Sequence, residues 1–150
     1  DGLESRGLGD VYKRQSLWLS TSKQIRVLCT GGEPLLQLDS DLISAFKEEG
    51  FYIAIETNGT LPAPKGIDWI CMSPKANTNI KLKSGNEIKV IHPQENYDPN
   101  DFMRFDFDDF YIQPMDSKSY SKNLKASLDF CMQNPRWSLS LQTHKILGIK

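Results

Sequence analysis

This 150-residue sequence has almost no net charge and few long apolar runs. Eighteen Lys and Arg against nineteen Asp and Glu leave a net charge of −1, so composition offers no electrostatic argument for binding nucleic acid or an anionic membrane surface. No apolar run approaches the roughly 20 residues of a transmembrane helix. The start lacks the apolar core of a secretory signal, so the expected compartment is the cytoplasm, without direct contact to nucleic acid or membrane.

Cysteine is also rare, and its spacing excludes the usual metal-binding motifs. Cys29, Cys71 and Cys131 lie far apart, and the sequence contains neither CxxC nor CxxxCxxC. Because the ligands of an iron–sulfur cluster must converge on one small loop, these three residues cannot substitute for such a loop. We expect reduced thiols, two of them on buried strands.

The composition does provide for an ordinary globular core, with 39% hydrophobic and 25% charged residues. The first fifteen residues, DGLESRGLGDVYKRQ, differ because they are polar, contain three glycines and lack helical or strand periodicity. This segment resembles a translated sequencing-adapter peptide, with a genuine flexible N-terminus as the alternative. We expect residues 1–15 to be non-native or disordered, and residues 16–150 to form the C-terminal part of a single domain.

From Gln24 onward, short apolar β-rich runs alternate with longer segments, several of them helical, which predicts repeated β/α units. Strands are expected at residues 25–30, 51–56, 67–72, 87–91, 109–113 and 137–142. Helices are expected over 39–49 and 117–134, with apolar faces of Leu42, Ile43 and Phe46 in the first and Leu124, Leu128 and Cys131 or Met132 in the second. The near-continuous apolar character of the strands predicts a parallel sheet buried on both faces.

Polar segments follow the predicted strands, at the point where each strand ends. They read TGGEP, ETNGT, SPK, HP, QPMD and QTHK. In parallel β/α folds, ligands bind beyond the carboxyl ends of the strands, where loops converge. The sequence therefore predicts one shared site at one edge of the sheet.

The segment CTGGEP, residues 29–34, has the composition of a turn that contacts a ligand. Its two glycines let a ligand approach the main chain, and Pro34 suits the first turn of a helix. It matches neither the phosphate-binding GxxxxGK[ST] pattern nor the dinucleotide GxGxxG pattern. The carboxylate of Glu33 can accept hydrogen bonds from an ammonium group, so an amino-acid-like ligand fits better than a phosphate. A simple tight turn is the alternative.

This ordered set of motifs resembles the radical S-adenosylmethionine (SAM) enzymes, and among them the family of 7-carboxy-7-deazaguanine synthases. The similarity is carried by VLCTGGEPLLQLD, IAIETNGT, ICMSPK, YIQPMD and WSLSLQTHKILGI within residues 16–150. It implies an α/β fold of the partial (β/α) barrel type, incomplete here because the first β/α unit is missing. It also implies a lyase that converts 6-carboxy-5,6,7,8-tetrahydropterin into 7-carboxy-7-deazaguanine with loss of ammonia, in the biosynthesis of queuosine and other 7-deazapurines.

The resemblance assigns roles to the matching positions. The substrate-binding positions are Thr30, Glu56 and His144. The SAM-binding positions are Gly32, Glu33, Ser73, Pro74, Lys75, Gln113, Pro114, Met115 and Asp116. Each type of residue also has a structural alternative, among them a Ser-Pro turn, a solvated lysine, an Asp116 helix cap, an Asn-Gly turn after Glu56 and a partly buried His144. His92 is expected in a loop, and residues 101–110 are expected to form a solvated helix or turn and not a metal site.

The resemblance further implies SAM, a 4Fe-4S cluster and Mg²⁺ as cofactors. Because the chain has no CxxxCxxC motif, we expect the cluster and Mg²⁺ to be held by a missing N-terminal part, and this chain alone to be inactive. The implied partners are the pterin substrate, an electron-donor protein such as flavodoxin, and a second copy in a homodimer. Two other hypotheses remain, namely another radical SAM enzyme such as a glycyl-radical activating enzyme, and a cluster-free β/α module that binds a small ligand.

Overall fold

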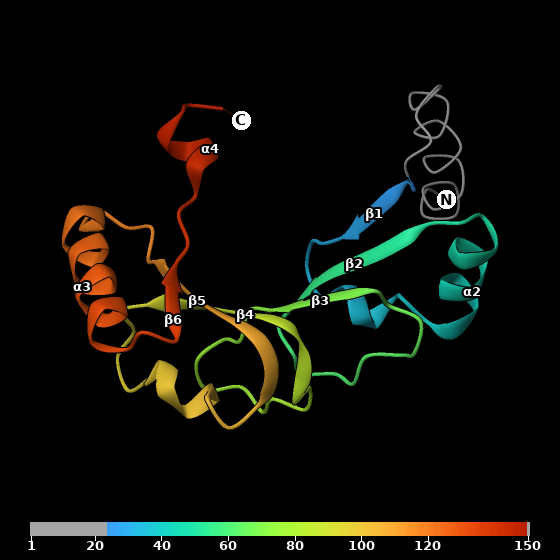
Figure 1. The fold of residues 1–150 in the computed structure, drawn as a ribbon, viewed down its shortest axis with the longest axis horizontal. Helices are drawn as coiled ribbons and strands as arrows, with labels where there is room; N and C mark the ends of the chain where they lie inside the picture. Colours follow the sequence, from blue (N-terminus) through green and yellow to red (C-terminus); the bar gives the residue numbers. More distant parts are fainter. Residues whose placement is uncertain (1–23, 150) are drawn as a thin grey trace, which may run out of the picture.

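One curved parallel sheet organises the chain, and the computed structural model describes it over residues 24–149. The strands are β1 (Arg26–Cys29), β2 (Tyr52–Thr57), β3 (Trp69–Met72), β4 (Ser84–His92), β5 (Asp106–Pro114) and β6 (Trp137–Leu139). They pair in sequence order, and every pair is parallel. Figure 1 shows the sheet bent into an open arc with β1 and β6 at its two ends. The predicted α/β partial barrel is confirmed, whereas the predictions for residues 1–15 lie outside the described residues.

The helices that lie between strands pack on the outer face of the arc, whereas the last helix follows β6 and does not lie on that face (Figure 1). The helices are the 3₁₀ helices η2 (Pro34–Leu36) and η3 (Pro99–Phe102) and the α-helices α2 (Ser40–Glu48), α3 (Tyr120–Gln133) and α4 (Thr143–Ile146). The helix predicted over 39–49 is confirmed, because the Asp39 carboxylate accepts a hydrogen bond from Leu42 N at 2.9 Å and Gly50 follows its end at φ 77°. Ile43 and Phe46 are buried as expected, but Leu42 is 37% exposed.

The core lies between these helices and one face of the sheet. Ile53, Ile55, Ile88 and Ile112 are fully buried there. Side chains alternate along each strand, so the neighbours of these buried residues point to the opposite, concave face, which carries polar side chains such as Glu56. No helix or strand of residues 24–149 covers the concave face (Figure 1). The prediction that the sheet is buried on both faces is therefore wrong for the described residues.

The buried face of α3 also differs from the prediction. Leu128 and Met132 are 45% and 74% exposed, whereas Asn123 and Ser127 are buried. The Asn123 amide and the Ser127 hydroxyl donate to backbone carbonyls at the ends of β5 and β4, at 2.8 and 3.2 Å. Because the carboxyl ends of these strands present carbonyl oxygens with spare acceptor capacity to the helix, hydrogen-bonding side chains face the sheet there.

Residues 101–110, expected to form a solvated helix or turn, supply aromatic core. Phe102, Phe105, Phe107 and Phe110 are all buried. Phe102 and Phe105 make an edge-to-face contact with ring centroids 5.5 Å apart. The acidic residues between them stay exposed, so the segment is amphipathic and its aromatic side belongs to the core.

Candidate functional site

The predicted site residues lie along the edge of the sheet where the strands end. Thr30 follows β1, Glu56 lies at the end of β2, Ser73, Pro74 and Lys75 follow β3, and Gln113 and Pro114 end β5 before Met115 and Asp116. All six strands point in the same direction, so these segments share one edge. His144 lies beyond β6, in α4, where it is exposed and not partly buried.

Glu33 ties the turn after β1 to the end of β2. Its Oε1 accepts hydrogen bonds from Leu35 N at 3.1 Å and from Thr57 Oγ1 at 2.6 Å. Its Oε2 accepts from Asn58 N at 2.8 Å. The carboxylate therefore caps η2 and clamps two neighbouring loops of the site, a contact that no local sequence pattern shows.

The main chain of the two glycines faces open space. Gly31 and Gly32 have φ angles of 82° and 49°, a conformation that other residues rarely adopt, and a Cβ added at either position would have no heavy atom within 4 Å. A cavity of about 170 Å³ lies beside this turn and reaches α2. A ligand can thus approach the backbone of this turn directly.

The segment after β2 forms the turn that the sequence predicts. Gly59 N donates to Thr57 Oγ1 at 3.1 Å, and Thr60 N donates to Asn58 Oδ1 at 2.9 Å. Glu56 precedes this turn and is exposed, whereas its neighbour Thr57 is buried. Because successive side chains of a strand point to opposite faces, Glu56 lies on the concave face. Within residues 24–149 the Glu56 carboxylate has no hydrogen bond or ion pair, so it remains available to a ligand.

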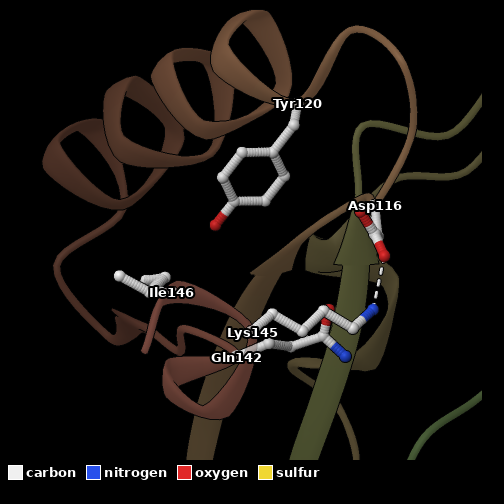
Figure 2. A pocket seen from close by; sticks show the side chains of 5 residues that line it. All are labelled: Asp116, Tyr120, Gln142, Lys145 and Ile146. Carbon is white, nitrogen blue, oxygen red and sulfur yellow. Dashed lines mark hydrogen bonds and ion pairs between the residues drawn. The ribbon is translucent and has the colours of Figure 1, made fainter. Parts of the chain in front are cut away.

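Asp116 borders a cavity of about 320 Å³ between the start of α3 and α4. Its lining residues are Asp116, Tyr120, Gln142, Lys145 and Ile146. Figure 2 shows the Lys145 ammonium reaching across to the Asp116 carboxylate, with which it forms an ion pair. Asp116 therefore pairs with α4 and does not cap α3, whose N-cap is Ser119. Tyr120 and Ile146 give this cavity an apolar side, and Asp116 and Gln142 a polar one (Figure 2).

A polar group on the concave face was missed by the sequence interpretation. Glu87 Oε1 accepts a hydrogen bond from Cys71 Sγ at 3.1 Å and forms an ion pair with Lys89 Nζ at 3.1 Å. Cys71 is the register partner of both Glu87 and Glu56, so all these side chains share one face. The available signal was the alternation of Glu87 and Lys89 with buried Ile88 and Val90, which is typical of a strand with one polar face.

The environment of this group sets its charges. Burial, and next the hydrogen bond to Glu87, raise the pKa of the Cys71 thiol well above its ordinary value, so the thiol stays protonated. Burial lowers the pKa of Lys89, whereas the carboxylates of Glu87 and Glu56 raise it. Lys89 is therefore a charged ammonium at neutral pH, and Cys71 is a hydrogen-bond donor and not a nucleophile.

The described residues do not fit a 4Fe-4S cluster. Cys29 lies on β1, Cys71 on β3 and Cys131 on α3, and all three thiols are free. Among residues 24–149, no three or more His, Cys, Asp or Glu side chains converge to hold a metal ion. Within the same range, no helix has the length and apolar character needed to cross a membrane.

His92 is not the loop residue that we expected. It is the last residue of β4, and its ring packs against Phe130 of α3 with centroids 5.1 Å apart. Its Nδ1 lies 3.3 Å from Ser127 Oγ. Burial lowers the pKa of His92, so this side chain is a neutral packing residue on the outer face.

The sequence of this chain is similar to those of several curated proteins of one name. The chain is 50% identical over 133 residues to a 7-carboxy-7-deazaguanine synthase of Burkholderia multivorans, covering 89% of this chain and 63% of that protein. It is 47% identical to the enzyme of the same name from Caulobacter vibrioides (90% and 64% covered) and 43% identical to that from Bordetella pertussis (97% and 69% covered). The chain thus spans just under two thirds of the length of the first two relatives. No family model matches it.

A solved structure supports the fold independently. A chain described as QueE from Escherichia coli superposes with a TM-score of 0.61 at 23% identity, covering 90% of this chain and 61% of that one. At this identity the likeness concerns the fold alone. Because the sequence matches to relatives of one name extend over nine tenths of its length, the chain belongs to the 7-carboxy-7-deazaguanine synthase family.

Proposed function

We propose that this chain supplies the SAM- and substrate-binding portion of a radical SAM lyase that converts 6-carboxy-5,6,7,8-tetrahydropterin into 7-carboxy-7-deazaguanine with loss of ammonia. The observation that carries the proposal is the convergence of the motif residues on one edge of a parallel sheet, in a chain of this family. Residues 16–150 are proposed to be the C-terminal part of a single domain that works in the cytoplasm, in the biosynthesis of queuosine and related 7-deazapurines.

The turn after β1 is proposed to bind the methionine part of SAM. Gly32 offers main-chain groups to open space, and Glu33 offers a carboxylate. A carboxylate has about four acceptor positions, and three of those on Glu33 are used within the protein. One position remains for the SAM ammonium group, and Thr30, which is exposed next to the turn, is proposed to face the substrate.

The ends of β3 and β5 are proposed to bind the rest of SAM. Ser73 and Lys75 can donate to carboxylate or ribose oxygens, and Gln113 can donate and accept. Pro74, Pro114 and Met115 complete these two segments. Asp116 can accept from ribose hydroxyls, although it is paired with Lys145. This ion pair is about half exposed, and such surface pairs contribute about 0–1 kcal/mol, so a ligand hydroxyl can displace the lysine at little cost.

Several components of the proposal lie outside the described residues. These are a 4Fe-4S cluster and Mg²⁺, an electron-donor protein such as flavodoxin, and a second copy of the chain. The cluster would be held outside the described residues, where it would supply the reducing electron for SAM cleavage. The residues of this chain contribute binding, orientation and exclusion of water around that chemistry. His144 and Glu56 are proposed to contact the pterin.

The experiment joins the N-terminal region of the Burkholderia multivorans relative to this chain and purifies the product without oxygen. SAM, a reductant and 6-carboxytetrahydropterin are added, and 5′-deoxyadenosine and 7-carboxy-7-deazaguanine are measured by chromatography. We expect both products, and deoxyadenosine only when the pterin is present. Deoxyadenosine formed with a protein glycine in place of the pterin would instead indicate a glycyl-radical activating enzyme.

The 150-residue chain alone is the matched control. We expect it to bind no stoichiometric cluster after iron and sulfide are added, because its three thiols do not converge. A stoichiometric cluster with SAM cleavage from this chain would contradict that expectation. Pterin binding without SAM cleavage by the joined protein would favour a cluster-free binding module.

A further inference from the structure

The concave face of the sheet carries one ammonium group that is held in place but incompletely used. Lys89 Nζ lies 3.1 Å from Glu87 Oε1, the same oxygen that accepts from Cys71 Sγ. The side chains of Lys89 and Glu87 are 24% and 18% exposed, so both remain partly open on this face. A lysine ammonium has three donors, and Glu87 engages one of them. Within residues 24–149 the others have no protein acceptor, so they are free to donate to a bound molecule.

This ammonium lies between the two halves of the proposed site. Lys89 shares its face of β4 with Ile91, whose register partner on β5 is Gln113, a proposed SAM contact. On the other side, Glu87 aligns through β3 with Glu56, a proposed substrate contact. A molecule bound on the concave face beside SAM therefore meets Lys89.

The charges around Lys89 favour a ligand that presents a neutral polar edge over one that presents an anionic group. Glu87 balances the charge of Lys89, and Glu56 adds an unpaired negative charge on the same face. Asp109, the register partner of Glu87 on β5, adds another. A ligand carboxylate would meet net negative charge there, whereas neighbouring N–H donors and a carbonyl acceptor would match a carboxylate beside an ammonium.

We propose that Lys89 is a substrate-binding residue that donates to the ring carbonyl of a 2-amino-4-oxopyrimidine edge, while Glu56 accepts from the amino and ring N–H groups of that edge. The inference rests on the proposed function and specifies how the pterin is oriented. In a pterin, the 2-amino group, N3–H and O4 follow one another along one side, so donors and acceptor occur in the required order. Glu87 and Cys71 are positioning residues for Lys89, and the 6-carboxylate points away from this acidic group.

The test compares two ligands on the 150-residue chain. One is 6-carboxypterin, and the other is 2,4-diamino-6-carboxypteridine, in which an amino group replaces O4. Binding is followed by the fluorescence of the pteridine ring. We expect the wild-type chain to prefer 6-carboxypterin by about 10- to 100-fold, because in the diamino compound an amino donor faces the ammonium and N3, which then carries no hydrogen, faces the Glu56 carboxylate.

Variants assign that preference to Lys89. Lys89→Met keeps the length of the side chain but removes the donors, and we expect it to reduce the preference by about tenfold and to leave the part that comes from N3–H and Glu56. Lys89→Arg keeps the donors and should retain most of the preference. Lys122→Met, an exposed lysine of α3, is the matched control and should behave as the wild type.

The outcomes separate this inference from the proposed function. Equal binding of both ligands by the wild-type chain overturns the role of Lys89, whatever the variants do. Full preference retained in Lys89→Met overturns it as well, and in both cases pterin binding itself still supports the proposed function. A wild-type chain that binds neither compound overturns both.

Discussion

Replacing Glu33 by Gln tests whether this carboxylate holds the glycine turn against β2. Its oxygens accept from Leu35 N, Thr57 Oγ1 and Asn58 N at 3.1, 2.6 and 2.8 Å. A glutamine has one carbonyl oxygen, so at least one backbone N–H then faces an NH₂ group. Because hydrogen bonds to charged groups contribute about 1.5–3 kcal/mol each and this site is half-buried, we expect Glu33→Gln to lower the free energy of unfolding by about 1–2 kcal/mol and Glu33→Ala by about 2–4 kcal/mol.

The assay is urea unfolding of the 150-residue chain, followed by tryptophan fluorescence. Glu95→Gln, at an exposed loop position, is the control and should change the free energy of unfolding by less than about 0.5 kcal/mol. A double-mutant cycle with Thr57→Val should give a coupling energy of about 1 kcal/mol, because the two side chains share a 2.6 Å hydrogen bond. If Glu33→Gln is as stable as the wild type and shows no coupling with Thr57→Val, the carboxylate does not hold the two loops together.

Three further predictions concern packing, acid stability and thiol reactivity. An alanine Cβ at Gly59 would lie 2.4 Å from Met72 Sδ, whereas one at Gly50, which has the same φ of 77°, would have no heavy atom within 4 Å. In urea unfolding we therefore expect Gly59→Ala to lower the free energy of unfolding by about 2–4 kcal/mol and Gly50→Ala by about 1 kcal/mol. Equal losses in the two variants would contradict this prediction. Burial raises the pKa of Asp68, but hydrogen bonds from a β2 backbone N–H and a lysine outweigh it and hold the pKa below its ordinary 3.8. Because the folded-state pKa is the lower one, this contribution is present at neutral pH and lost as the pH falls through the folded value. Wild-type stability should therefore fall more steeply than that of Asp68→Asn between about pH 5 and pH 3, and equal slopes would count against the argument. Cys71 is buried with a raised pKa, so iodoacetamide should label it much more slowly in the folded chain than in urea, as read by mass spectrometry of its peptide; equal rates would show that the thiol is accessible.

Local sequence patterns were sufficient for most of the elements. Asp39 and Gly50 bracket α2 because capping involves only groups within a few residues of the helix ends. The strands can be predicted because apolar β-rich runs bounded by turn residues are also local features of the sequence. The edge that holds the candidate site can be predicted from the order of strands and helices, since the carboxyl ends of parallel strands lie at the same edge of the sheet.

The face that each element buries could not be predicted as well. In α3, the apolar stripe of Leu128 and Met132 is exposed, and the polar Asn123 and Ser127 are buried. The deciding partners are strand-end carbonyls, and for Ser127 the partner is 35 residues away in sequence. Periodicity identifies an apolar stripe, but it does not show which groups another element presents to it.

The amino-acid sequence was enough to establish the order of the elements, the parallel sheet and the glycine turn with its nearby carboxylate, because propensities, caps and turn chemistry are local. The folded chain was needed to show that Glu33 holds Thr57, 24 residues away, and that Glu87 joins Cys71, 16 residues away, beside Lys89. Such contacts depend on strand register and on the curvature of the sheet. Both arise when distant segments pack, so the chemistry of the concave face emerges only from the tertiary structure.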